Sequence, residues 1–371
     1  MEGGTLLQLR NLINRRNISS DISGKFNAAI DFFELVVTGY ILAAAMHYFH
    51  LTSLEGIPTK NVISPSTNSK DSWTTLKHAV ERIVDRYVMV NEYLLDQENE
   101  GGTVEVKNTD SNPHVSRIAR EHNYCIPDTS AVSKTAKKKR KLPAWLIDDR
   151  VASLSVQKRV PDGVFNYSSA ILNDGLLLVE FRDSVHFAAG PRVTRCWKFM
   201  LLHWRYAKHA KYSLEALHLL AAINATATER IAHELTWCRF INTRGVPGGN
   251  MPVDLYMEHL NRTLKDYLKG LGANVSEATI TQTSKSLRNL MELTSHFDSI
   301  CDIHPESIYH TCKRYGKDLD MVIEELTQKS RVFDYVPGRF HRSFKDIKPH
   351  ISDHIDLDSL FKWIKKSIKA K

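Results

Sequence analysis

The sequence predicts a mainly α protein, a multi-helix globular array with few or no strands. Apolar residues recur at three- and four-residue spacing along most of the chain, which is the periodicity of one helix face. The alternation of apolar and polar residues that would predict strands is nearly absent. Hydrophobic residues make up 42% of the 371 residues and charged residues 25%, which is ordinary for a globular protein with its own core.

The expected helices follow one another along the chain. The first long one is a core helix with apolar residues at helical spacing from Phe26 to Ala44. The run Leu35 to Phe49 is too short to span a bilayer and contains His47, so we expect no membrane segment. The same pattern repeats between Trp73 and Leu95. Further helices are expected near residues 144–157, 164–188, 191–208, 211–223, 227–241, 253–270, 277–297 and 317–329.

Residues 99–143 differ from the rest because small and polar residues replace large apolar ones. Such a composition cannot offset the entropy of ordering, so we expect a disordered linker. The predicted parts are an N-terminal helical part (1–98), the linker (99–143), a helical core (144–345) and a C-terminal basic amphipathic helix (346–371). We expect the apolar stripe of that last helix to pack on the body rather than on a membrane.

Two basic tracts account for the net charge of +8. They consist of Lys137, Lys138, Lys139, Arg140 and Lys141 in the linker, and of Lys362, Lys365, Lys366, Lys369 and Lys371 at the end. Without them the chain is close to neutral, so the sequence establishes no basic globular surface. The linker tract fits an importin-type nuclear-import signal or a phosphate-binding tract, with a solubilising linker as the alternative. The five cysteines, odd in number, indicate reduced thiols in an intracellular protein, and the tract favours the nucleus.

The most informative stretch runs from Asn242 to Arg262, where a glycine- and proline-rich turn leads directly into a helix. The turn holds Gly245, Gly248, Gly249 and Asn250, and the helix carries Asp254, Glu258, Asn261 and Arg262. Asp254 and Glu258 are candidate acidic ligands for a hard cation such as Mg²⁺. Alternatively, Asp254 suits the positive helix N-terminus and Glu258 pairs with Arg262. The glycines either shape a phosphate-facing loop or join two helices, and their spacing is not that of a P-loop.

A second stretch, Val336 to Phe344, mixes basic and aromatic residues. Aromatic faces stack on bases and arginines bind phosphates, so this stretch could contact nucleic acid. An ordinary packed loop is the alternative.

Several blocks together resemble one uncharacterised family, a numbered domain of unknown function that is found in high copy and often beside mobile-element sequence. The blocks include Phe181–Asp183, Arg195–Phe199, Leu235–Trp237, Asp254–Arg262, Leu271–Asn274 and Val336–Gly338. The block Asp-Leu-Tyr-Met-Glu-His-Leu-Asn-Arg is the most specific of them, and the resemblance spans nearly the whole chain. It implies a transposon-derived origin.

The resemblance also implies a segment upstream of Thr5 that is lacking here. If the family is similar to RNase H-like transposases, that segment would carry the sheet and the first acidic ligand. Asp254 or Glu258 would then be the late acidic ligand on a helix. Two-metal phosphoryl transfer needs several converging carboxylates, and Asp254 and Glu258, even with Asp183, do not make such a centre.

We therefore expect a truncated C-terminal half that has no catalysis on its own, binds nucleic acid weakly at most and needs no cofactor. One alternative is a free-standing nuclear helical protein-interaction module. Another is a Mg²⁺-dependent DNA-processing enzyme, if an upstream segment supplies the missing carboxylates. The oligomeric state stays open.

Overall fold

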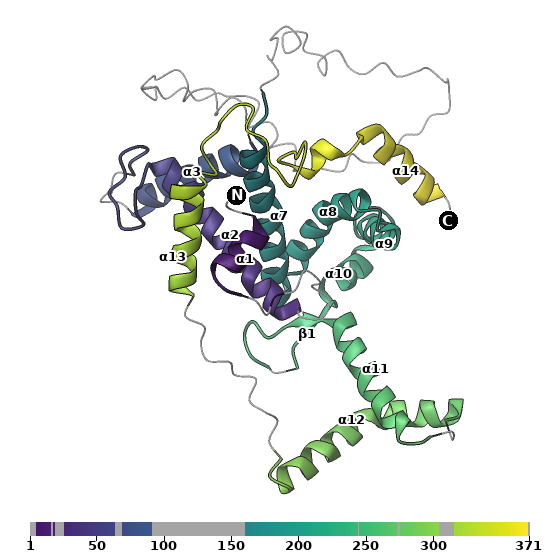
Figure 1. The fold of residues 1–371 in the computed structure, drawn as a ribbon. Coiled ribbons are helices and arrows are strands. Elements are labelled where there is room, and N and C mark those ends of the chain that lie inside the picture. The colour runs from purple at the N-terminus through teal and green to yellow at the C-terminus, as the bar shows by residue number, and fades with distance from the viewer. Residues whose placement is uncertain are drawn as a thin grey trace, which may run out of the picture. The chain divides into compact units, whose positions relative to one another are not determined.

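The computed structural model describes residues 5–15, 18, 26–63, 69–90, 160–243, 245–272, 275–303 and 315–369. These residues form eleven α-helices and one two-stranded antiparallel sheet (Figure 1). The prediction of a mainly α fold with few strands is therefore confirmed. The described residues before 92 and from 161 onward belong to one compact unit. The predicted linker, its tract Lys137–Lys141 and the predicted helix 144–157 lie outside the described residues.

The N-terminal helices are α1 (Leu6–Leu12), α2 (Phe26–Phe49) and α3 (Ser69–Ile83), and α3 continues into a π-helical turn, Val84–Val88. The side chain of Thr5 begins α1 by accepting a hydrogen bond from the backbone N–H of Gln8. The Gln8 side chain accepts in turn from the backbone N–H of Thr5, which completes a capping box.

The second half contains most of the helices. In chain order its elements are α7 (Gly163–His186), α8 (Gly190–Tyr206), α9 (Ala210–Ala221) with the π-helical turn Ala222–Thr226, α10 (Glu229–Trp237), β1 (Phe240–Ile241), β2 (Met251–Pro252), α11 (Val253–Lys269), α12 (Glu277–Ile300), α13 (Gly316–Glu324) with the π-helical turn Glu325–Lys329, the 3₁₀ turn Ile351–His354 and α14 (Leu357–Lys369). The break predicted at Gly190 and Pro191 is where α8 begins, with proline in the first turn. Proline suits this position because the first N–H groups of a helix have no partner within the helix.

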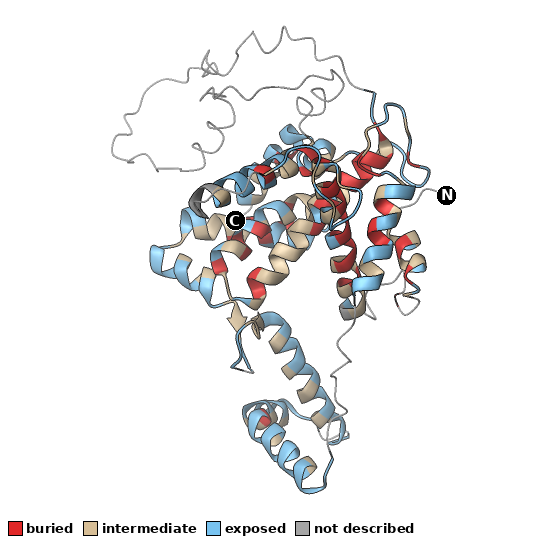
Figure 2. Ribbon diagram, turned by 90° about the vertical axis from the view of Figure 1, so that its left-hand side faces the viewer, coloured by how far each residue is buried: buried red, intermediate tan, exposed pale blue. Residues whose placement is uncertain are grey.

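The core is built around α2, which packs between α13 and α7 (Figure 1). Val36, Val37 and Tyr40 of α2 are almost completely buried. Two glycines permit the close crossings: a Cβ on Gly39 would fall 2.5 Å from a methyl carbon of Val322 in α13, and one on Gly175 of α7 would overlap Val37. Figure 2 shows the buried residues concentrated in these central helices, whereas α11 and α12 are mainly exposed or intermediate.

The segment Ala28–Phe49 of α2 is also the one described helix that is long and apolar enough to cross a membrane. In this structure 56% of its most apolar window is buried inside the protein. Its apolar residues pack on α7 and α13, as a core helix requires.

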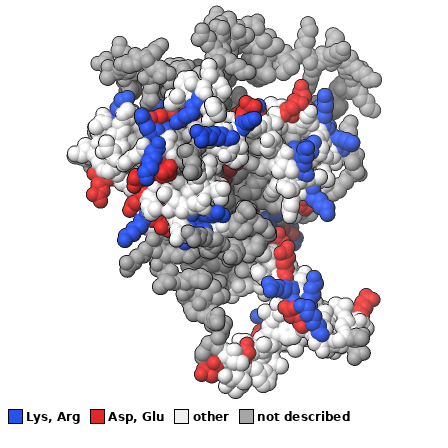
Figure 3. Space-filling view, in the orientation of Figure 1, with Lys and Arg blue, Asp and Glu red and all other residues white. Residues whose placement is uncertain are grey.

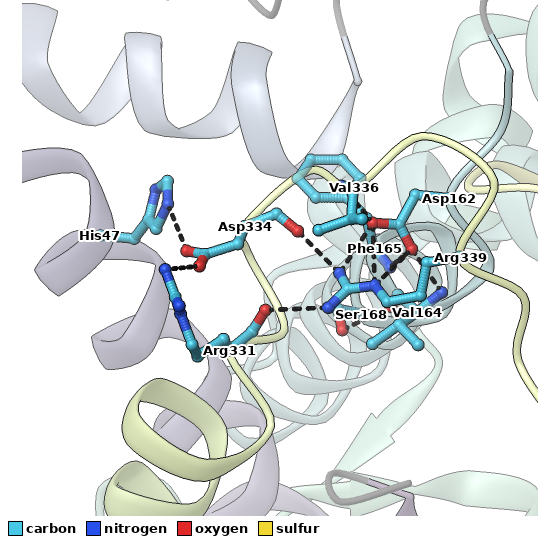
Figure 4. A network of polar contacts seen from close by, with 9 residues as sticks. All are labelled: His47, Asp162, Val164, Phe165, Ser168, Arg331, Asp334, Val336 and Arg339. Carbon is cyan, nitrogen blue, oxygen red and sulfur yellow. Dashed lines mark hydrogen bonds and ion pairs between the residues drawn. The ribbon is translucent and has the colours of Figure 1, made fainter.

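An ion pair between the fully buried Asp162 and the half-buried Arg339 joins the start of α7 to the segment that follows α13 (Figure 4). Asp162 is fully buried, and its carboxylate accepts hydrogen bonds from the backbone N–H groups of Val164 (2.9 Å) and Phe165 (3.1 Å), which caps α7. The same carboxylate accepts from the guanidinium of Arg339 at 2.7 and 3.0 Å and from the backbone N–H of Val336 at 2.8 Å. A buried carboxylate is tolerated here because each of its oxygens has partners.

The network continues from Arg339 towards α2. The Arg339 guanidinium donates to the carbonyls of Asp334 (2.7 Å) and Arg331 (3.3 Å), and the carboxylate of Asp334 pairs with Arg331 (Figure 4). Asp334 also lies 3.2 Å from Nε2 of His47, whose Nδ1 is 2.7 Å from the hydroxyl of the buried Tyr87. A continuous set of polar contacts therefore links α7, α2 and the segment 331–339.

We predict that Arg339→Met lowers the free energy of unfolding by about 3–5 kcal/mol, because it leaves the Asp162 carboxylate buried without its cation. Urea denaturation followed by circular dichroism measures the change. The matched control is Arg192→Met, which removes a bidentate arginine from the exposed carboxylates of Glu180 and Asp183 and should change stability little. Equal effects of the two substitutions would contradict the role given to the buried pair.

Candidate functional site

The structure places the predicted acidic residues on the solvent side of α11. Asp254, Glu258, Asn261 and Arg262 are all exposed. The Asp254 carboxylate accepts a hydrogen bond from the backbone N–H of Leu255 (2.9 Å) in the first turn of the helix. Among the residues that the structure describes, no three His, Cys, Asp or Glu side chains gather closely enough to hold a metal ion. Asp254 and Glu258 thus lie together on one helix face without a third ligand from the described part of the chain.

The glycine-rich turn before α11 forms a β-hairpin. Phe240 pairs with Pro252 and Ile241 with Met251. Gly245 and Gly248 have positive φ values of +66° and +72°, which suit glycine. The side chain of Asn242 holds the loop by donating to the carbonyl of Val246 (2.8 Å) and accepting from the N–H of Gly245 (2.8 Å).

The hairpin is attached to the body through Asn250, whose side-chain amide donates to the carbonyl of His186 at the end of α7 (2.7 Å). The backbone of Gly249 is equally confined, because a Cβ there would lie 2.9 Å from a methyl carbon of Val246. These residues of the turn therefore shape the hairpin and fix the start of α11.

Asp254 acts electrostatically on Arg239, which lies just after the end of α10. Burial lowers the pKa of Arg239, and the carboxylates of Asp254 and Glu215 oppose this by favouring the cation. The guanidinium lies 5.4 Å from the ring centroid of Trp197 in α8. Asp254 on α11 and Glu215 on α9 therefore both favour the charged form of a half-buried arginine that lies against α8.

The other carboxylate considered from the sequence, Asp183 on α7, belongs to a separate cluster. Its carboxylate accepts a hydrogen bond from Arg192 at 2.7 Å, and Glu180 accepts two from the same guanidinium. These hydrogen bonds from Arg192 hold the pKa of Glu180 below its usual range. Asp183 is thus engaged by a cation on α8.

A different region carries a strong sequence signal that the net charge conceals. Between Asp183 and Glu215 the chain has no Asp or Glu, and it contains six Lys or Arg residues and six Phe, Trp or Tyr residues. The basic residues are Arg192, Arg195, Lys198, Arg205, Lys208 and Lys211, and the aromatic residues are Phe187, Trp197, Phe199, Trp204, Tyr206 and Tyr212. This stretch forms α8 and the start of α9. Without its two lysine-rich tracts the chain is close to neutral, yet α8 and the start of α9 form a locally basic stretch.

The C-terminal helix brings further lysines to this element. α14 packs on α9, and its Trp363 and Ile364 contact a buried cluster of Leu201, Ala216 and Leu217. The guanidinium of Arg205 lies 4.9 Å from the ring centroid of Trp363. The packing of the last helix onto the body thus places its lysines beside the basic stretch.

We define the α8–α9–α14 face by its six polar members, Arg205, Lys208, Lys211, Tyr212, Lys362 and Lys366. All are exposed except Arg205, which is half-buried against Trp363. Figure 3 shows Lys and Arg side chains over α14 and α9 on the right-hand side of that view, and others spread over its left-hand side. The second predicted stretch, Val336 to Phe344, contributes less, because Arg339 points inward to Asp162 and His341 is buried.

Fold and surface together define an α-helical protein with a basic, aromatic face and a small hairpin that leads into an exposed helix. Residues 2–310 match the profile of a family of unknown function, DUF6589, and the chain belongs to this family. The match spans the Asp254–Arg262 block and the basic stretch of α8 and α9. No curated protein and no solved structure matches the chain.

We predict that Asn250→Ala loosens the hairpin, because it removes the hydrogen bond to the His186 carbonyl, with a loss of about 1 kcal/mol. Hydrogen exchange of peptides covering residues 240–253 should become faster. The matched control is Asn224→Ala, whose amide donates to the Leu220 carbonyl within its own helical segment. Unchanged exchange of the hairpin in Asn250→Ala would show that another contact holds it.

Proposed function

We propose that the protein binds nucleic acid through the α8–α9–α14 face and is a nuclear protein derived from a mobile element. The observation that supports binding most strongly is the acid-free stretch 184–214, with basic and aromatic residues combined and exposed at its end. Lysine and arginine side chains bind phosphates and release the counterions that condense on them. Aromatic rings among the cations add stacking surface, which ordinary solvated charge does not provide.

The tract Lys137–Lys141 would add to this affinity and serve as an importin-type nuclear-import signal. It lies outside the described residues, so the proposal rests on its composition alone. The mobile-element origin rests on the resemblance carried by blocks such as Asp254–Arg262.

We propose neither a catalytic activity nor a cofactor for this protein. Asp254 and Glu258 are exposed carboxylates one turn apart on a single helix, and Asp183 is engaged by Arg192. Two-metal phosphoryl transfer requires carboxylates that converge on ions about 4 Å apart. The enzyme alternative would need further carboxylates in addition to these.

Protein interaction is a second candidate, supported by one observation on α12. Leu293, Phe297 and Ile300 follow one side of this helix and are 51%, 57% and 66% exposed. An exposed apolar stripe of this kind is typical of a docking surface. A purely protein-binding module would show no salt-dependent affinity for nucleic acid, so the titration below separates the two candidates.

We predict that the double variant Lys208→Gln/Lys211→Gln binds nucleic acid more weakly and with a smaller salt dependence. Log K falls as log salt rises. Removal of two phosphate contacts should make this negative slope shallower by about 1.4–1.8 units. Fluorescence anisotropy with a labelled oligonucleotide, titrated at several salt concentrations, measures both quantities. The control is Lys265→Gln/Lys285→Gln, which removes the same charge from exposed positions on α11 and α12.

Binding that is equally weakened by both double variants would indicate a general charge effect and contradict the assignment to this face. Affinity that is negligible and flat with salt in the unmodified protein would contradict nucleic-acid binding altogether.

We predict that Mg²⁺ does not raise the thermal unfolding midpoint, because two exposed carboxylates on one helix bind such an ion weakly. Thermal unfolding of the protein and of Glu258→Gln with and without Mg²⁺ tests this. A stabilisation that is lost in Glu258→Gln would favour the metal-dependent enzyme, since a ligand that binds only the folded state raises its stability.

A further inference from the structure

Tyr212 of the proposed face and the nearby Tyr206 at the end of α8 both have largely exposed side chains. Tyr212 is 62% exposed and Tyr206 is 53% exposed. Each ring is nevertheless positioned by a neighbour. The Tyr212 ring stacks on Trp204 with centroids 5.8 Å apart and planes at 29°, and Tyr206 lies 5.0 Å from the ring of His354. Such rings are held on one side and open on the other.

The Trp204–Tyr212 pair is suited to extension by a further ring. Trp204 is anchored in the cluster of Leu201, Ala216 and Leu217, so the stack starts from a buried base. A planar group placed on the open side of Tyr212 would continue the stack outward. Ring stacking favours near-parallel, offset planes, which is the arrangement that the Trp204–Tyr212 pair already has.

Several cations belong to the same elements as this stack. Lys211 adjoins Tyr212 in the sequence at the start of α9, Lys208 lies in the connection between α8 and α9, and both are exposed. On α14, Lys366 follows Trp363 by one helical turn, and Trp363 lies against Arg205. A ligand that offers planar rings and phosphates in alternation matches this combination of stacking surface and positive charge.

Single strands and duplexes differ in what they present to such a face. In a duplex the bases are already stacked on one another and show only their edges in the grooves, so an exposed tyrosine ring gains little from them. In a single strand the base faces are accessible, and stacking on an aromatic side chain stabilises the complex whatever the base.

We infer that the α8–α9–α14 face takes single-stranded nucleic acid, with a base stacked on Tyr212 and the adjoining phosphates on Lys208 and Lys211. This inference rests on the proposed nucleic-acid function and names its ligand. The stacking requirement is common to DNA and RNA strands, so the experiment includes both.

The test compares three labelled probes by fluorescence anisotropy with the full chain: an oligo(dT), an oligo(U) of equal length and a DNA duplex of the same number of base pairs. We expect at least one single strand to bind about tenfold more tightly than the duplex at the same salt concentration. Tyr212→Leu should weaken single-strand binding about tenfold and leave duplex binding unchanged, because it removes one base–aromatic stack. Tyr212→Phe, which keeps the ring, should bind like the unmodified protein.

The outcomes distinguish a failure of the single-strand inference from a failure of the proposed nucleic-acid binding. Duplex binding as tight as that of both single strands, or an unaltered affinity in Tyr212→Leu, would overturn the single-strand inference and leave nucleic-acid binding in place. Failure of all three probes to bind would overturn the proposed function itself. Tighter binding of oligo(dT) or of oligo(U) would support the inference and identify DNA or RNA as the ligand.

The variants are chosen so that a folding defect does not imitate a binding defect. Tyr212 is largely exposed, so its replacement by leucine should leave the unfolding midpoint unchanged, which circular dichroism checks. If the midpoint falls, Tyr206→Leu provides the same comparison at the second exposed ring, and Lys208→Gln/Lys211→Gln should weaken all three probes alike.

Discussion

The ion pair between Asp162 and Arg339 ties the start of the central helix α7 to the segment that follows α13. The Asp162 carboxylate begins α7, the helix that packs on both α2 and α8. Arg339 belongs to the segment that leads from α13 towards α14, and the backbone joins the two as well, since the N–H of Gly163 donates to the Arg339 carbonyl. One buried pair thus fixes the start of the central helix and the path of the chain towards α14. Loss of one partner would leave the other charge buried without compensation, which destabilises the folded state.

The helices could be predicted from the sequence because their apolar spacing is regular and their ends carry recognisable residues. The pattern beginning at Phe26 indicates α2, and Gly190 with Pro191 marks the start of α8. The sequence predicts less where contacts between distant segments determine the conformation and the burial of a residue. The sequence shows Pro161, Asp162 and Gly163 only as a break between helices, whereas the structure makes Asp162 a buried cap and ion-pair partner. Likewise, the glycines from 245 to 249 indicate a turn, but the pairing of β1 with β2 depends on residues that alternate too briefly to predict strands.

The candidate surface differs from the one that the sequence analysis emphasised, and the reason is physical. Asp254 and Glu258 belong to the most specific sequence block. A metal site would also need ligands from other elements, which the spacing within one helix does not predict, and both residues face solvent on α11. The basic stretch before Glu215 can be found in the sequence, but the net charge of the whole chain does not reveal it, because acidic residues elsewhere balance it. The lysines of the last helix could be read as a separate tail. Their position beside Arg205 follows from the contact between Arg205 and Trp363, which only the folded chain reveals.

The most direct test of this account is a hydrogen-exchange footprint of the full chain with and without a saturating oligonucleotide. We predict slower exchange in peptides that cover residues 203–214 and 357–369, because the ligand would cover the α8–α9 corner and α14. Peptides from α11 and α12 should exchange as in the free protein. Protection confined to α11 and α12, or to the tract Lys137–Lys141, would contradict the assignment of binding to the α8–α9–α14 face.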